Sequence, residues 1–309
     1  MRYAFLFPGQ GSQSFGMGQD MYENFTQSRE LLDRASEFCK IDFKSLLFIK
    51  NDNLGISEFT QPAVVLNSLM CYLAIEECLN LRPVFAMGHS LGEFSALAVS
   101  GGLDFLDAIK LVNTRGRLMQ KACEGKNATM MVVLGLDDQS VEEICEKARE
   151  IGKQVWAVNY NSDGQIVVAG LRDDLVSLEK TFKDAGAKRV MLLDMSVASH
   201  CPLQESASTI LAGELELVIK NKFSPVISNS TSKAYTTKEE ALTLLKEQLV
   251  KPVLYKQSIK NIDDKVDCYI EFGASTLKGI NKKITLKPTF SITNPKSLEE
   301  FMSFYKDNF

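Results

Sequence analysis

The sequence predicts an α/β fold, with a large domain built on a parallel sheet and a smaller domain inserted into it. Two observations support this prediction. Short apolar runs of strand length alternate with helical segments toward both ends of the 309-residue chain, and this alternation is typical of a parallel sheet covered by helices on both faces. A middle stretch instead follows the order βαββαβ, which forms a compact unit by itself.

The elements of the large domain follow from apolar runs and from apolar residues at helical spacing. Strands are expected at residues 3–7, 82–87, 226–228 and 268–272. Helices are expected at residues 21–38, 61–78, 91–99, 104–123, 238–249 and 276–284. Together these elements predict a large domain that comprises residues 1–126 and 197–309.

The inserted domain is predicted over residues 127–196. Its strands are expected at residues 129–134, 154–158, 166–169 and 189–193, and its helices at 140–151 and 175–184. Turn chemistry in Asn161-Ser162-Asp163-Gly164-Gln165 separates the second strand from the third. This order of elements matches the small ferredoxin-like fold.

Composition argues against several classes of protein. A net charge of −4 and an isoelectric point near 5.5 disfavour binding to nucleic acid. No apolar run is long enough to span a bilayer, and the first apolar run reaches Pro8-Gly9 too soon for a signal peptide. The seven cysteines are an odd number without a Cys-x-x-Cys pair. We therefore expect reduced thiols, no metal site, no membrane association and a cytoplasmic location.

The pentapeptide Gly88-His89-Ser90-Leu91-Gly92 fits the Gly-x-Ser-x-Gly nucleophile elbow, because it lies between an expected strand and an expected helix. This context indicates an α/β-hydrolase-like large domain with Ser90 as the nucleophile. A serine needs a base to take its proton. The chain has two histidines, and His200 is the candidate because His89 adjoins the serine. The alternative is an ordinary turn with a serine near a helix N-cap.

Ser90 precedes the inserted domain and His200 follows it. We therefore expect the active site in the cleft between the two domains. Cys201 also adjoins His200, but sequence neighbours need not face each other, so we interpret Cys201 as a small packing residue.

Two further segments could complete a site for acyl transfer. Gln10 lies in a loop between two glycines after the first expected strand. Its backbone N–H and that of Leu91 are candidate donors to an oxyanion. A simple tight turn is the alternative, and a phosphate-binding loop is disfavoured because no Lys-Ser/Thr follows. Arg115 lies in an expected helix, either as a solvated surface charge or as a bidentate partner of a substrate carboxylate.

Six motifs then occur in order along the chain, at residues 7–13, 88–97, 115–120, 159–170, 199–202 and 248–253. Together they resemble the signatures of the malonyl-CoA:acyl carrier protein transacylases, the free-standing bacterial enzymes of fatty acid synthesis. The resemblance extends from Tyr3 to Ile284. Two segments depart from the pattern of these relatives: Gly273-Ala274-Ser275 stands where Gly-Pro-Gly is usual, and Ala198 where proline is common.

The resemblance implies a ping-pong reaction. Ser90 would take a malonyl group from malonyl-CoA, and the resulting malonyl-serine would pass it to the phosphopantetheine thiol of acyl carrier protein. His200 would act as the base, while the backbone N–H groups of Gln10 and Leu91 would hold the oxyanion. Arg115 would bind the malonyl carboxylate. Gln248 would lie near His200, where a main-chain carbonyl orients the imidazole in place of an acid.

The resemblance also implies no metal and no cofactor besides the two substrates, and we expect a monomer. A serine thioesterase or other hydrolase could use the same two side chains. A stand-alone acyltransferase that serves a polyketide synthase would use the same chemistry. A carrier-protein binder without activity is disfavoured because Ser90, His200 and Arg115 are all present.

Overall fold

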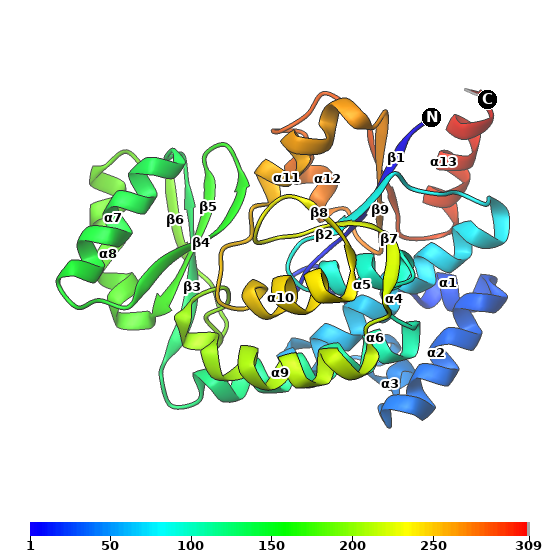
Figure 1. Cartoon of the computed structure of the whole chain (residues 1–309), viewed down its shortest axis with the longest axis horizontal. Coiled ribbons are helices and arrows are strands. Elements are labelled where there is room, and N and C mark those ends of the chain that lie inside the picture. The colour runs from blue at the N-terminus through cyan, green and yellow to red at the C-terminus, as the bar shows by residue number, and fades with distance from the viewer. Residues whose placement is uncertain (308–309) are drawn as a thin grey trace.

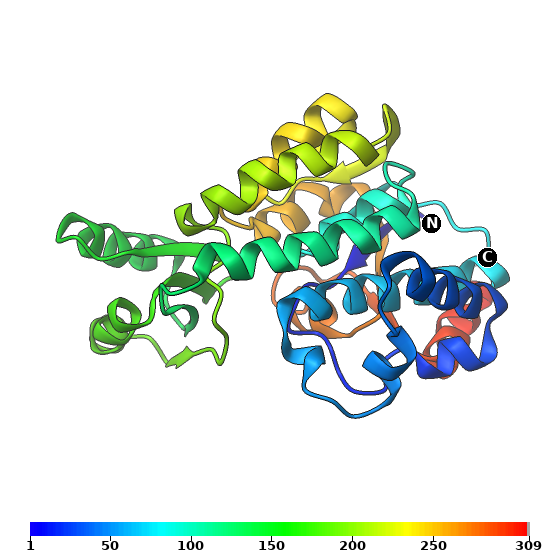
Figure 2. The same cartoon turned by 90° about the horizontal axis from the view of Figure 1, so that it is seen from below.

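The computed structural model describes residues 1–307 of the chain. Within them, the strands form two separate sheets, one from the two ends of the chain and one from its middle. Figure 1 shows the middle segment, in green, as a lobe beside the larger body. Figure 2 shows the same two parts from below. The α/β fold class predicted from the sequence is confirmed.

The larger sheet has the strand order β10-β9-β1-β2-β7-β8. Neighbouring strands from β10 to β7 pair in parallel, whereas the edge strand β8 runs antiparallel to β7. The strands are β1 (Tyr3–Phe7), β2 (Phe85–Gly88), β7 (Lys222–Ile227), β8 (Ala234–Thr237), β9 (Cys268–Phe272) and β10 (Thr289–Ile292). The predicted parallel sheet is present, and it carries an antiparallel edge strand that the sequence analysis missed.

Helices cover both faces of this sheet, as the central strand β1 shows. Successive side chains of a strand point to opposite faces, so Phe5 and Phe7 join one apolar core while Ala4 and Leu6 join another. The helices are α1 (Gln19–Asn24), α2 (Thr26–Cys39), α3 (Phe43–Phe48), α4 (Ser57–Cys78), α5 (Gly92–Val99), α6 (Phe105–Cys123), α9 (Glu205–Val218), α10 (Lys238–Gln248), α11 (Tyr255–Ile262), α12 (Thr276–Asn281) and α13 (Pro295–Asp307), with short 3-10 turns at Asn53–Gly55, Pro202–Gln204 and Asp263–Lys265. Among the described helices, none combines the length and the apolar character needed to cross a membrane.

The smaller sheet has the strand order β4-β5-β3-β6, and all its pairs are antiparallel. Its elements follow the predicted order βαββαβ and give the ferredoxin-like arrangement. They are β3 (Ala128–Leu134), α7 (Asp138–Glu150), β4 (Val155–Ser162), β5 (Gln165–Leu171), α8 (Arg172–Asp184) and β6 (Arg189–Leu192). A separate apolar core lies between this sheet and its helices.

Several element boundaries differ from those predicted from the sequence. The helix predicted at 21–38 is two helices, because Phe25 adopts an extended backbone conformation and packs against the core. The turn predicted to begin at Asn161 is confined to Asp163 and Gly164, because β4 continues through Ser162. Elements that the sequence analysis did not assign are α3, α9, α11, α13, β8 and β10.

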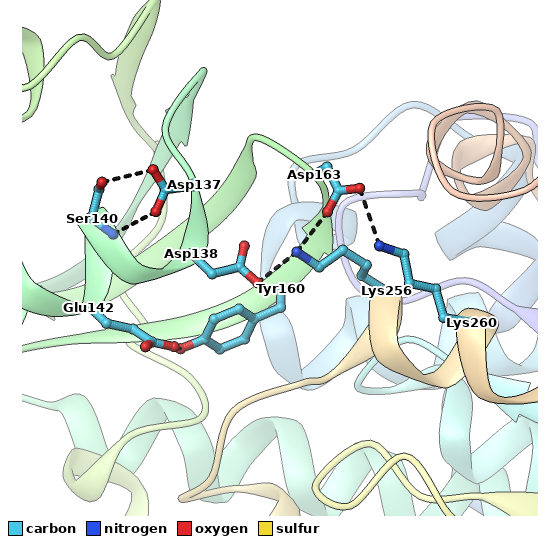
Figure 3. A network of polar contacts seen from close by, with 8 residues as sticks. All are labelled: Asp137, Asp138, Ser140, Glu142, Tyr160, Asp163, Lys256 and Lys260. Carbon is cyan, nitrogen blue, oxygen red and sulfur yellow. Dashed lines mark hydrogen bonds and ion pairs between the residues drawn. The ribbon is translucent and has the colours of Figure 1, made fainter.

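A polar cluster joins the smaller sheet to helix α11 of the larger body (Figure 3). The ammonium of Lys256 on α11 lies 2.6 Å from Asp138 Oδ2 and 3.0 Å from Asp163 Oδ1. Asp138 begins α7, and Asp163 lies in the turn between β4 and β5. Lys260, one turn further along α11, lies 3.2 Å from Asp163 Oδ2. Lys256 therefore holds two parts of the smaller lobe against one helix of the larger body.

Backbone hydrogen bonds support the same junction. The N–H of Tyr160 in β4 donates to the carbonyl of Val253, and the N–H of Val253 donates to the carbonyl of Val158. The position of β4 relative to the larger body is thus set by main-chain atoms as well as by Lys256. This matters for the site below, because β4 also carries residues that line it.

We predict that Lys256→Met lowers the free energy of unfolding by about 1–2 kcal/mol, because the ammonium is nearly buried and its loss leaves two carboxylates without their shared cation. Lys260→Met is the matched control, and it should cost less than about 0.5 kcal/mol because Lys260 is exposed. Urea denaturation of both variants measures the difference. Equal losses would show that Lys256 does not hold the junction.

Candidate active site

Ser90 lies in the sharp turn between β2 and α5, and its φ of 51° is in the left-handed region. The two glycines of the motif make this turn possible. A Cβ on Gly88 would lie 2.0 Å from the carbonyl carbon of Gly92, and a Cβ on Gly92 would lie 2.0 Å from the carbonyl oxygen of Phe7. Neither position accepts a side chain, so the chain folds locally into the strained elbow that the sequence predicted.

The structure brings Ser90 and His200 together, although 109 residues separate them in the sequence. Ser90 Oγ lies 2.7 Å from His200 Nε2. On the other side of the ring, Nδ1 lies 2.6 Å from the main-chain carbonyl oxygen of Gln248. A carbonyl can only accept, so Nδ1 carries the proton and Nε2 is left to accept the serine hydroxyl. Among the described residues, no carboxylate hydrogen-bonds to His200.

The surroundings keep His200 neutral. Burial lowers its pKa to about 3, and the positive charge of Arg115 acts in the same direction. The imidazole is therefore in its proton-accepting form at neutral pH, which a general base requires.

Arg115 lies beside the same hydroxyl and is 1% exposed. Its guanidinium donates to Ser90 Oγ at 3.2 Å through Nη2, which also donates to Gln248 Oε1 at 3.1 Å. Nη1 donates to Gln61 Oε1 at 2.9 Å. Within residues 1–307, Arg115 forms no ion pair and its Nε has no hydrogen-bond partner. The interpretation of Arg115 as a solvated surface charge is wrong.

A buried cation without an acid partner is costly unless something compensates it. Burial lowers the pKa of Arg115 to about 10, which still leaves the group charged at neutral pH. All its hydrogen-bond partners are neutral oxygens. This arrangement favours a ligand that brings a carboxylate next to Ser90.

The candidate oxyanion donors are the backbone N–H groups of Gln10 and Leu91. Gln10 lines the cleft, and its side-chain amide donates to Ser57 Oγ. Leu91 follows the serine and packs its side chain in the core. In the described part of the chain, neither backbone N–H has a protein acceptor, so both can donate to a ligand. The N–H of Ser90 itself is occupied, since it donates to Asn229 Oδ1 at 2.6 Å.

Both parts of the molecule line the cleft, which has a volume of about 420 Å³. Gln10, Ser90, Arg115 and His200 come from the larger body. The smaller lobe contributes Met130, Asn159, Asn161, Gln165 and Val167. This volume lies within the range of sites that bind small ligands.

Several residues that hold the site in place were not predicted from the sequence. Glu93 and Asn229 are fully buried below the elbow, and Gln61 holds Arg115. Asn161 Oδ1 lies 2.8 Å from His89 Nε2, which ties the histidine of the motif to the smaller lobe. Glu93 alone left a signal, as a charged residue in an otherwise apolar helix start.

Metal ligands and a second nucleophile are the remaining groups that could add chemistry to the site. Among residues 1–307, no cluster of three or more histidine, cysteine or acidic side chains could hold a metal. Cys201 is buried, its thiol contacts the carbonyl of Ala198, and burial raises its pKa to about 12. A thiol of that pKa is a poor nucleophile at neutral pH.

The lowered pKa of His200 predicts a pH effect on stability. Above the ordinary pKa of 6.5, His200 is neutral in both the folded and the unfolded chain. Between pH 7 and pH 5 the unfolded chain takes up a proton that the folded protein does not, so the free energy of unfolding should fall by about 2 kcal/mol from this residue. Denaturation of His200→Gln at both pH values should lack this part of the fall, and Ser90→Ala should keep it. An equal fall in wild type and His200→Gln would contradict the prediction.

Comparisons with known proteins agree with this geometry. Residues 4–286 match the family model described as acyl transferase domain. Curated relatives named malonyl CoA-acyl carrier protein transacylase include one from Bacillus subtilis, 35% identical over 96% of this chain and 95% of the relative. Another comes from Escherichia coli K12, 36% identical over 96% of this chain and 97% of the relative.

Solved structures give the same result. The malonyl-CoA:acyl carrier protein transacylase from Helicobacter pylori has 47% identity and a TM-score of 0.95, with 99% of each chain covered. A malonyl-transacylase in complex with a type II PKS acyl-carrier protein has 33% identity and a TM-score of 0.94, covering 98% of this chain and 100% of that one. The chain belongs to the acyl transferase domain family and, within it, to the malonyl-CoA:acyl carrier protein transacylases.

Proposed function

We propose that this protein transfers a malonyl group from malonyl-CoA to the phosphopantetheine thiol of acyl carrier protein, through a malonyl ester of Ser90. One observation carries the proposal: Ser90 Oγ contacts a neutral histidine nitrogen and a buried, unpaired guanidinium at the same time. The first contact activates a nucleophile, and the second selects an acyl group that carries a carboxylate.

In the first half-reaction, Ser90 Oγ attacks the thioester carbonyl carbon while its proton moves to His200 Nε2. The carbonyl oxygen becomes an oxyanion, and the N–H groups of Gln10 and Leu91 are the proposed donors to it. The carbon–sulfur bond then breaks, and the coenzyme A sulfur leaves with the proton from His200. The carbonyl of Gln248 keeps the imidazole in the required tautomer.

The second half-reaction reverses these steps with another thiol. The phosphopantetheine sulfur of acyl carrier protein gives its proton to His200 and attacks the ester carbonyl. Ser90 Oγ leaves and regains the proton, so the enzyme returns to its starting state. No cofactor takes part, because acyl carrier protein brings its own phosphopantetheine.

We also propose that the large domain comprises residues 1–126 and 197–309, and the inserted domain residues 127–196. All strands of the smaller sheet fall between Ala128 and Leu192, which supports this division. We also propose that the protein acts as a monomer. All seven cysteines are free thiols, in keeping with a cytoplasmic location.

A second candidate function is supply of malonyl groups to a polyketide carrier protein. The likeness to a malonyl-transacylase solved with a type II PKS acyl-carrier protein favours it. The chemistry at Ser90 is the same in both cases. Comparing the transfer rates to the two kinds of carrier protein would separate the candidates.

Arg115→Ala should lower malonyl transfer by about 100-fold or more, because a buried bidentate contact to the carboxylate is lost. Transfer of an acetyl group, which has no carboxylate, should change much less. Arg117→Ala is the matched control, since Arg117 lies on the exposed side of the same helix. Equal losses for the two acyl groups would make Arg115 a structural residue and would contradict its role in specificity.

Intact-protein mass spectrometry tests the covalent step. Mixing the protein with malonyl-CoA should add one malonyl group, and phosphopantetheinylated acyl carrier protein should then remove it and carry it. Ser90→Ala should give no adduct, whereas Cys201→Ser should still give one. Release of free malonate without any thiol acceptor would indicate a thioesterase instead, and an adduct on Ser90→Ala would place the nucleophile elsewhere.

A further inference from the structure

The fully buried carboxylate of Glu93 lies directly beneath the nucleophile elbow, in the first turn of α5. It accepts three hydrogen bonds. Oε2 accepts from Gln248 Nε2 at 2.7 Å and from the backbone N–H of Asn229 at 3.1 Å. Oε1 accepts from the hydroxyl of Tyr235 at 3.1 Å. The reaction steps described above use none of these contacts.

Two of these donors belong to residues that hold the elbow. Asn229 accepts the N–H of Ser90 through Oδ1 and donates to the carbonyl of Gly88 through Nδ2. Gln248 donates to the carbonyl of Ser90 through the same Nε2 that contacts Glu93. The carboxylate of Glu93 therefore fixes the side chains of Asn229 and Gln248, which hydrogen-bond to the backbone of the elbow at Gly88 and Ser90.

The contact between Glu93 and Gln248 also affects Arg115, the proposed partner of the acyl carboxylate. The side-chain amide of glutamine has a donor end and an acceptor end. An ionised carboxylate and a carbonyl can only accept, so Glu93 and the carbonyl of Ser90 both require the Nε2 end of Gln248 to face them. The Oε1 end is thereby directed to Arg115, where it accepts from Nη2. With the amide reversed, a donor would face the guanidinium and displace it.

The geometry points to Glu93 as a positioning residue for the proposed malonyl transfer: it sets the orientation of the Gln248 amide, and through it the position of Arg115 for the malonyl carboxylate. Glu93 touches neither the substrate nor the reacting atoms. Burial raises the pKa of Glu93 to about 7 even though its hydrogen bonds and the charge of Arg115 lower it, so the assays below are run at pH 8, where the carboxylate is ionised. The inference rests on the proposed function, because it assumes that Arg115 binds a carboxylate.

Glu93→Met tests the inference with a side chain of similar length that has no oxygen to accept a hydrogen bond. Gln248 Nε2 and the N–H of Asn229 then lose the carboxylate oxygen that they share, so the donor end of the Gln248 amide is held by the carbonyl of Ser90 alone. The readout is the ratio of kcat/KM for malonyl-CoA to that for acetyl-CoA, with acyl carrier protein as the acceptor. This ratio does not depend on the fraction of folded protein, so a general loss of structure leaves it unchanged.

We expect Glu93→Met to lower this ratio by about tenfold or more, since a displacement of about 1 Å at a positioning group is enough for such an effect. Tyr235→Phe is the matched control: it removes one hydrogen bond to the same carboxylate and leaves the contacts to Gln248 and Asn229 in place. Its ratio should stay within about threefold of the wild-type value.

Two outcomes would overturn the inference. An unchanged ratio would mean that Glu93 only supports the fold. A raised ratio would mean that its charge competes with malonyl for Arg115. If Glu93→Met yields no folded protein, Glu93→Asp decides, because its shorter carboxylate should also lower the ratio. The wild-type protein in the same assay tests the proposed function separately, since a failure to transfer malonyl at all would refute that function before any variant is compared.

Discussion

The site depends on one buried positive charge that has no acid to pair with. The guanidinium of Arg115 is held by three neutral oxygens, and one of them is the hydroxyl of the nucleophile. A buried cation in this state binds an anion more strongly than a solvated one would, because water no longer competes for it. In the proposed reaction, this single side chain would bring together the carboxylate of the acyl group and the serine that attacks the same group.

The surrounding residues hold the guanidinium of Arg115 and the hydroxyl of Ser90 in fixed positions relative to each other. Glycines at 88 and 92 allow the elbow to approach β1 and α5 closely, and Glu93 supports the elbow from below. Gln248 serves twice, because its carbonyl orients His200 while its amide contacts Arg115. A main-chain carbonyl replaces the acid of a serine–histidine–aspartate triad. Because no described carboxylate hydrogen-bonds to His200, a malonyl carboxylate bound as we propose would not meet a like charge there.

The sequence was sufficient for the fold class, the elbow and the order of elements in the smaller sheet, because each depends on local pattern. The elbow motif and the scarcity of histidine also indicated Ser90 and His200, and the family resemblance added Arg115 and Gln248; the structure brings all of them together. The roles of Gln10 and Leu91 stay predictions, since they concern donors to a ligand. Asn229 and Gln61 could not be found from the sequence, because their partners come from distant segments and nothing in their own neighbourhood indicates the contact. Glu93 stood out as a charged residue in an apolar helix start, but its partners also come from distant segments. The break at Phe25 in the helix predicted at 21–38 was not foreseen for a related reason, because tertiary packing of that ring overrides a continuous helical pattern.

A crystal structure of the acyl-enzyme formed with malonyl-CoA tests the central claim most directly. It should show an ester on Ser90, with the malonyl carboxylate within hydrogen-bond distance of both terminal nitrogens of Arg115 and the ester carbonyl oxygen at the N–H groups of Gln10 and Leu91. Arg115 should then have released its hydrogen bond to Ser90 Oγ. A malonyl carboxylate directed to solvent, with Arg115 still bound only to Gln61 and Gln248, would contradict the account.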